Sequence, residues 1–139
     1  MFSFGRKKLG LALTCSDWRL HQSAVEYNRR IARALGVGGL DLIAVPGPDG
    51  LLVPARASEW QTALRQTMVL IGAHHPVAIG LVAHQRCAGH AVSDEEHETD
   101  VLAVAAALKE ATKFEGPLSA MLTVYHSDKR WSLKQIGVI

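Results

Sequence analysis

The sequence predicts a single α/β domain over residues 1–139, built on a mostly parallel open sheet that is covered by helices. Short apolar runs alternate three times with stretches of helical periodicity, and two further strands follow. Strands that alternate with helices pair in parallel through right-handed crossovers, which places the helices on the faces of the sheet. The size also fits one globular domain, because the 139 residues are 48% hydrophobic and 20% charged.

The first strand and helix are predicted over residues 9–14 and 22–35. The first range is a short apolar run, as in a buried parallel strand. In the second, apolar side chains recur at helical spacing, and Gly36 then ends the pattern. Residues 40–45 predict the next strand, and the Pro-Gly-Pro-Asp-Gly segment 46–50 predicts an irregular loop after it.

The second helix is predicted over residues 58–71. Ser58 and Gln61 have the spacing of a capping box, which indicates a helix N-terminus. Apolar residues continue at helical spacing until Gly72 and Pro76, where we expect the helix to end.

The third strand, residues 77–83, ends where polar and small residues replace hydrophobic ones. Ser93 and Glu96 form a second capping-box pair, and acidic residues at this point suit the positive end of a helix. We expect this third helix to run through Leu108 and to end before Gly116.

The C-terminal part predicts two neighbouring strands. Residues 118–125 form an apolar run, residues 127–130 predict a turn, and residues 131–139 have the mixed polarity of an antiparallel edge strand. The expected sheet order is therefore 2-1-3-4, with strand 5 antiparallel at the edge.

Composition excludes several classes of function. The net charge is only +2 and the basic residues are scattered, so we expect no nucleic-acid partner. The apolar run before Cys15 is too short for an export signal or a membrane span, which predicts no membrane partner and a cytoplasmic location. The two cysteines are too few for a disulfide scaffold and are expected to stay reduced.

Three reactive residues follow strands that should be neighbours in the sheet. Cys15 comes directly after the first strand, and His84 and Cys87 come after the third. The carboxyl ends of adjacent parallel strands meet at one edge, where ligands gather. Two thiolates and one imidazole match a catalytic zinc site with one open position, since a structural site normally has four protein ligands. The alternative is a pair of small buried thiols with no metal.

Asp17 and Arg19 lie beside this predicted site. Asp17 is two residues past Cys15, so its carboxylate can either bind the cation or face its open position. Arg19, two residues further, can hold that carboxylate through a bidentate hydrogen bond. Both roles of Asp17 remain open from the sequence.

Two segments carry a resemblance to a known family: Cys15-Ser16-Asp17-Trp18-Arg19 and His84-Gln85-Arg86-Cys87. They resemble the Cys-x-Asp-x-Arg and His-x-x-Cys motifs of the β-class carbonic anhydrases. The resemblance implies that Cys15, His84 and Cys87 bind Zn²⁺ and that Asp17 and Arg19 form the catalytic dyad. It also implies reversible hydration of carbon dioxide to bicarbonate by a zinc-bound hydroxide, in a homo-oligomer that is a dimer or a higher multiple.

The resemblance leaves alternatives open. The wider family includes zinc hydrolases of carbonyl sulfide or carbon disulfide, and a non-catalytic zinc-binding relative is a third hypothesis. The chain departs from the family pattern at Ala88, which stands where glycine is usual, and at residues 45–50, which replace an Arg-Asn-Ala-Gly segment. Among the seven histidines, His90 is the candidate proton shuttle because of its position close to Cys87.

Overall fold

The computed structural model describes residues 7–127 and 130–139, and within them five strands form one sheet in the order β2-β1-β3-β4-β5. The strands are β1 (Leu9–Thr14), β2 (Gly39–Ala44), β3 (Ala78–His84), β4 (Leu118–Ser127) and β5 (Arg130–Val138). β1 to β4 pair in parallel, and β5 pairs antiparallel with β4. The predicted fold class and strand order are confirmed. The predicted turn over 127–130 includes residues 128 and 129, which lie outside the described residues.

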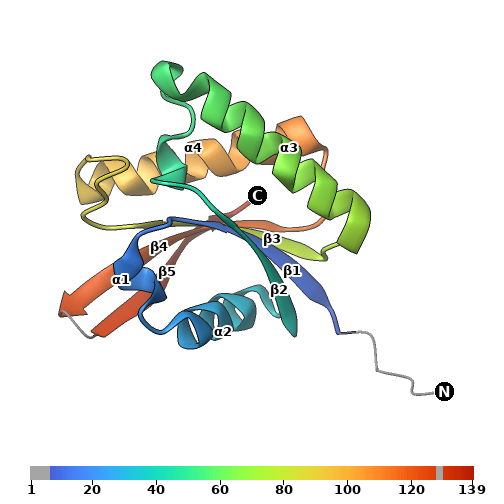
Figure 1. Ribbon diagram of the computed structural model, residues 1–139, viewed down its shortest axis with the longest axis horizontal. Helices are drawn as coiled ribbons and strands as arrows, with labels where there is room; N and C mark the ends of the chain where they lie inside the picture. The colour runs from blue at the N-terminus through green and yellow to red at the C-terminus, as the bar shows by residue number, and fades with distance from the viewer. Residues whose placement is uncertain (1–6, 128–129) are drawn as a thin grey trace.

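Helices cover both faces of the sheet (Figure 1). One face carries α1 (Trp18–His21) and α2 (Ala24–Leu35), and the other carries α3 (Ala57–His74) and α4 (Asp94–Thr112). Every residue of β3 is buried, as its continuous apolar run predicts for a central strand covered on both sides. Among the described residues, no helix is long and apolar enough to cross a membrane.

Two hydrophobic clusters fill the layers on either side of the sheet. On the side of α4, Leu13 and Leu81 of the sheet pack with Val104. On the side of α2, Tyr27 and Ile31 pack against the opposite face of the sheet. Successive residues of each central strand thus point to opposite faces of the sheet and enter different clusters. This alternation fixes the register of each strand and therefore the position of the residue that follows it.

Three short elements of the structure were not predicted. They are α1 and two 3₁₀ helices between β2 and α3, η1 (Pro48–Gly50) and η2 (Pro54–Arg56). α1 has only four residues, too few to show helical periodicity, and it begins where the Asp17 side chain accepts a hydrogen bond from the Arg19 N–H. These elements surround the carboxyl ends of β1 and β2.

The predicted helix ends hold in part. Ser93 caps α4, with its hydroxyl accepting a hydrogen bond from the Glu96 N–H at 3.2 Å, and Gly36 ends α2 in the left-handed conformation. The capping box at Ser58 is wrong, because η2 runs directly into α3 and Ser58 is already inside the first turn. The end of the second helix lies between the two predicted residues, Gly72 and Pro76, because α3 continues through Gly72 to His74. A helical glycine costs only about 1 kcal/mol, and apolar packing of this helix against the core outweighs it.

Candidate metal centre

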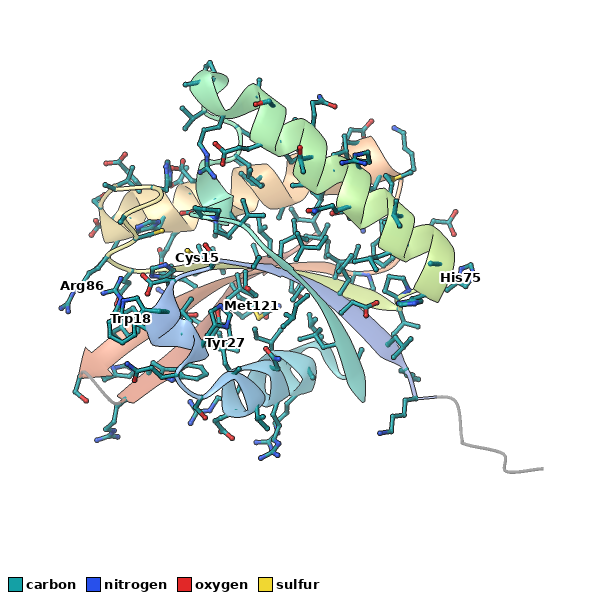
Figure 2. All side chains as sticks on the ribbon, in the orientation of Figure 1. Cys15, Trp18, Tyr27, His75, Arg86 and Met121 are labelled. Atoms are coloured by element: carbon teal, nitrogen blue, oxygen red, sulfur yellow. The ribbon has the colours of Figure 1, made fainter. Side chains whose placement is uncertain are left out.

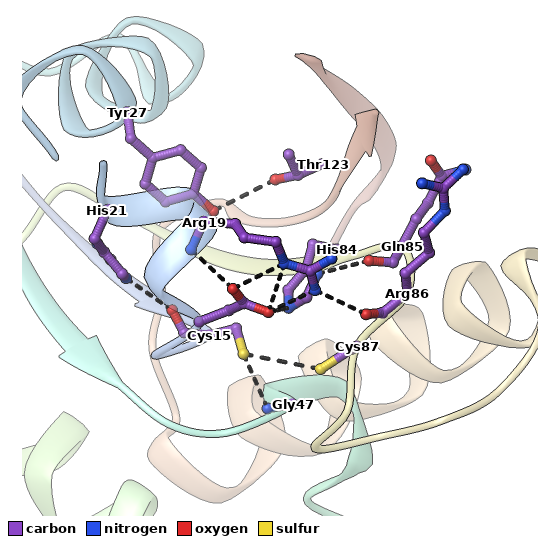
Figure 3. A network of polar contacts seen from close by, with 11 residues as sticks. Cys15, Arg19, His21, Tyr27, Gly47, His84, Gln85, Arg86, Cys87 and Thr123 are labelled. Atoms are coloured by element: carbon purple, nitrogen blue, oxygen red, sulfur yellow. Dashed lines mark hydrogen bonds and ion pairs between the residues drawn. The ribbon is translucent and has the colours of Figure 1, made fainter. Parts of the chain in front are cut away.

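The structure brings Cys15, His84 and Cys87 together at the carboxyl ends of β1 and β3. Their ligand atoms all lie within 4.8 Å of one another, and the two Sγ atoms are 3.8 Å apart (Figure 3). The register of the two strands explains this meeting, because Thr14 of β1 pairs with Val82 of β3. Cys15 and His84 therefore leave neighbouring strands at the same edge.

The three side chains are shielded from solvent. Cys15 and Cys87 are 4% and 3% exposed, and His84 is fully buried. The loop between His84 and Cys87 reverses sharply at Arg86, whose φ of 54° lies in the left-handed region that L side chains rarely adopt. Figure 2 shows Cys15 and Arg86 at one end of the sheet, with His75 at the opposite end.

The orientation of His84 leaves one ring nitrogen free for a ligand. Its Nδ1 lies 2.7 Å from the carbonyl oxygen of Gln85, which fixes the ring as a donor at that nitrogen. Its Nε2 is buried and has no hydrogen-bond partner among the described residues. A buried, unpartnered ring nitrogen facing two sulfurs is the donor set that Zn²⁺ accepts, so the residues fit this cation.

The two cysteine side chains are in direct contact, and each changes the pKa of the other. A hydrogen bond from the Cys87 thiol lowers the pKa of Cys15 well below its ordinary value, and the Gly47 N–H also donates to Cys15 Sγ, at 3.3 Å. The same thiol contact raises the pKa of Cys87. This contact favours the thiolate form of Cys15, and a cation held by both sulfurs would require loss of the Cys87 proton as well.

Asp17 and Arg19 form the bidentate pair that their spacing suggests. Arg19 Nε donates to Asp17 Oδ1 at 3.0 Å, and Nη2 donates to Oδ2 at 2.6 Å. These hydrogen bonds lower the pKa of Asp17 to about 2, so the carboxylate stays ionised at neutral pH. Asp17 Oδ2 also lies 3.8 Å from His84 Nε2, which places the pair beside the three candidate ligands.

Arg19 also joins the two motifs to each other. Its Nη2 donates a second hydrogen bond to the carbonyl oxygen of Arg86, at 2.9 Å, within the loop that separates His84 from Cys87. A cavity of about 330 Å³ opens beside the guanidinium and is lined by Trp18, Arg19, Gln22, Arg86, Tyr125, Ser127 and Trp131. Arg19 thus lines this cavity, while its partner Asp17 lies beside His84.

Comparison with known protein families shows which family the chain belongs to. A family model described as "putative carbonic anhydrase" matches residues 5–137. The chain belongs to this carbonic anhydrase family. Among curated proteins, none matches the chain.

One contact at the candidate metal centre of this carbonic anhydrase family member could not be predicted from the sequence. Gly47, in the loop after β2, supplies the N–H that faces Cys15. Its φ is 48°, and a Cβ atom there would lie 2.7 Å from the carbonyl carbon of Gly89. Only glycine fits both the backbone conformation and the contact. The Pro-Gly-Pro pattern around Gly47 indicates a tight turn but does not reveal its partner.

His90 is the candidate proton shuttle, but its side chain does not project freely into solvent. Its side chain is 11% exposed, and its Nε2 lies 2.6 Å from Asp100 Oδ2 on α4. The imidazole is therefore held in an ion-pair geometry. Its role in proton transfer stays a prediction.

Proposed function

We propose that the chain is a β-class carbonic anhydrase, a zinc lyase that reversibly hydrates carbon dioxide to bicarbonate. The observation that carries this proposal is the buried group of Cys15, His84 and Cys87 with the Asp17–Arg19 pair directly beside it, in a chain of the carbonic anhydrase family. Two sulfurs and an imidazole favour zinc over magnesium or calcium, which prefer oxygen ligands.

Each residue has a distinct proposed role. Cys15, His84 and Cys87 would hold the zinc ion, which would lower the pKa of a water molecule so that it can attack carbon dioxide as hydroxide. Asp17 is the catalytic carboxylate, and it accepts a hydrogen bond from the attacking water to aim the oxygen lone pair at the substrate. Arg19 keeps Asp17 ionised and fixed in direction. The engagement of both carboxylate oxygens by Arg19 supports this role over direct binding to the cation.

The hydration rate is expected to rise from neutral to alkaline pH. Cys15 and Cys87 place two negative charges next to the cation, so the reacting water is less acidic than among three neutral imidazoles. Asp17 does not cause this rise, because its pKa of about 2 leaves it ionised throughout. Stopped-flow measurement of carbon dioxide hydration across this pH range, on protein of known zinc content, checks the expectation.

The same measurement distinguishes the alternatives. Stoichiometric zinc with no hydration even at alkaline pH contradicts the proposal. Carbonyl sulfide and carbon disulfide are then the substrates to assay, and inactivity on all three leaves the non-catalytic relative. A homo-oligomer and a cytoplasmic location stay predictions.

A further inference from the structure

Helix α4 is joined to two loops of the metal centre by two reciprocal Asp–His pairs. His97 of α4 lies 2.5 Å, from Nδ1 to Oδ2, from Asp49 of η1. Asp100, one turn further along α4, lies 2.6 Å from Nε2 of His90, three residues past Cys87. The two imidazole rings also meet edge to face, with centroids 5.8 Å apart. One side of α4 thus fixes both loops.

The Asp49–His97 pair is buried to an unusual degree. Both side chains are fully shielded from solvent. The remaining polar atoms of the pair, Asp49 Oδ1 and His97 Nε2, have no hydrogen-bond partner among the described residues. An apolar pair of the same volume fills such a space at no desolvation cost, so stability alone does not account for these two residues. What the pair supplies is a fixed direction between η1 and α4.

The turn that Asp49 holds in place contacts both cysteine-bearing loops. Gly47, two residues before Asp49, donates its N–H to Cys15 Sγ. The backbone of Gly47 also packs against that of Gly89, too closely for any Cβ atom. A further constraint comes from Gly50, where a Cβ would lie 2.6 Å from Nδ1 of the His90 ring. Displacement of the turn would therefore move the donor to Cys15 and the loop that carries Cys87.

We propose that His97 and Asp100 are positioning residues for the metal centre. His97 acts through Asp49 and the Gly47 N–H on Cys15, and Asp100 acts through His90 on the loop that carries Cys87. This inference rests on the proposed zinc site but not on the proposed reaction. Neither residue is in the ligand set, and their effect is on the geometry and affinity of the site.

The test measures zinc affinity and a spectroscopic signature in matched variants. Asp49→Ala and Asp100→Ala each break one pair. We expect each to weaken zinc binding about 10-fold, the lower end of the range for groups that contact a metal ligand directly, because Asp49 and Asp100 reach the ligands only through the loops. Zinc affinity is measured by chelator competition, and the thiolate-to-cobalt absorption of the Co²⁺-loaded protein reports the sulfur geometry. Both variants should shift this absorption. Asp49→Asn, which keeps an acceptor for His97 Nδ1, should restore most of the affinity.

The control variant is Asp41→Ala. It breaks a third Asp–His pair, between Asp41 Oδ2 and His74 Nδ1 at 2.6 Å, which joins β2 to α3 away from the centre. Zinc affinity and the cobalt spectrum should not change in this variant. Lower stability of Asp49→Ala and Asp100→Ala with unchanged affinity and spectra overturns the inference. If Asp49→Ala does not fold, the Asp100→Ala variant still tests the inference. Unchanged zinc affinity in that variant would show that Asp100 does not position the metal centre. Zinc-loaded wild-type protein with no hydration activity contradicts only the proposed function, whereas wild-type protein that binds no zinc overturns both.

Discussion

Replacement of Cys87 by serine is expected to weaken zinc binding by more than about 100-fold and to abolish hydration. Loss of an outer partner of a metal ligand already costs 10- to 100-fold in affinity, so loss of a ligand itself should cost more. Serine has nearly the same size as cysteine, but its hydroxyl is not a thiolate donor for zinc. Metal analysis after dialysis against a weak chelator, together with stopped-flow hydration, measures both effects.

Two controls accompany the Cys87→Ser variant. Cys15→Ser should lose zinc and activity to a similar degree, because both cysteines are proposed ligands of the same ion. Their Sγ atoms lie 3.8 Å apart. His74→Asn, at an exposed histidine away from the centre, should retain both. A Cys87→Ser protein with stoichiometric zinc and full activity would show that Cys87 is only a small buried side chain.

Asp17→Asn is expected to retain zinc and to lose about 100-fold in hydration rate. Loss of a positioned group that handles a proton in the reaction typically costs this much or more. Asparagine can still cap α1, as Asp17 does through the Arg19 N–H, so the local fold should persist. Asparagine is uncharged and has a single side-chain oxygen, so it cannot form the charged bidentate pair with Arg19 and accepts a weaker hydrogen bond from water. Zinc content and hydration rate are measured on the same preparation.

Arg19→Gln is the companion variant, since it removes the partner that holds Asp17. It should lower the rate without loss of zinc, and its effect should not add to that of Asp17→Asn in the double variant, because the two residues act as one unit. A loss of zinc in Asp17→Asn, in contrast, would place Asp17 among the ligands, with its carboxylate bound to the cation.

Periodicity predicted the sheet well and the connections poorly. β3 and α4 show strong patterns, because a doubly covered strand reads as a continuous apolar run and a capped amphipathic helix repeats every three to four residues. α1 and η1 are too short for any period to appear, and they depend on contacts made in the folded chain. The apparent capping box at Ser58 was wrong because η2 leads directly into α3, which already begins at Ala57.

The proximity of the proposed ligands was predictable because topology alone brings the ends of adjacent parallel strands together. That argument placed Cys15 near His84 and Cys87, as the structure shows. It could not reveal the Gly47 N–H or the two residues of α4, because these contacts depend on how separate loops pack in three dimensions. A lone histidine in a helical sequence gives no signal that it will pair with an aspartate 48 residues away.

X-ray absorption at the zinc edge of the wild-type protein tests the metal centre most directly. We expect two sulfur atoms at about 2.3 Å and one imidazole nitrogen at about 2.0 Å from a single zinc ion, with a light atom in the fourth position. A first coordination sphere without sulfur, or a protein that binds no zinc when the metal is supplied, would contradict the assignment of Cys15, His84 and Cys87.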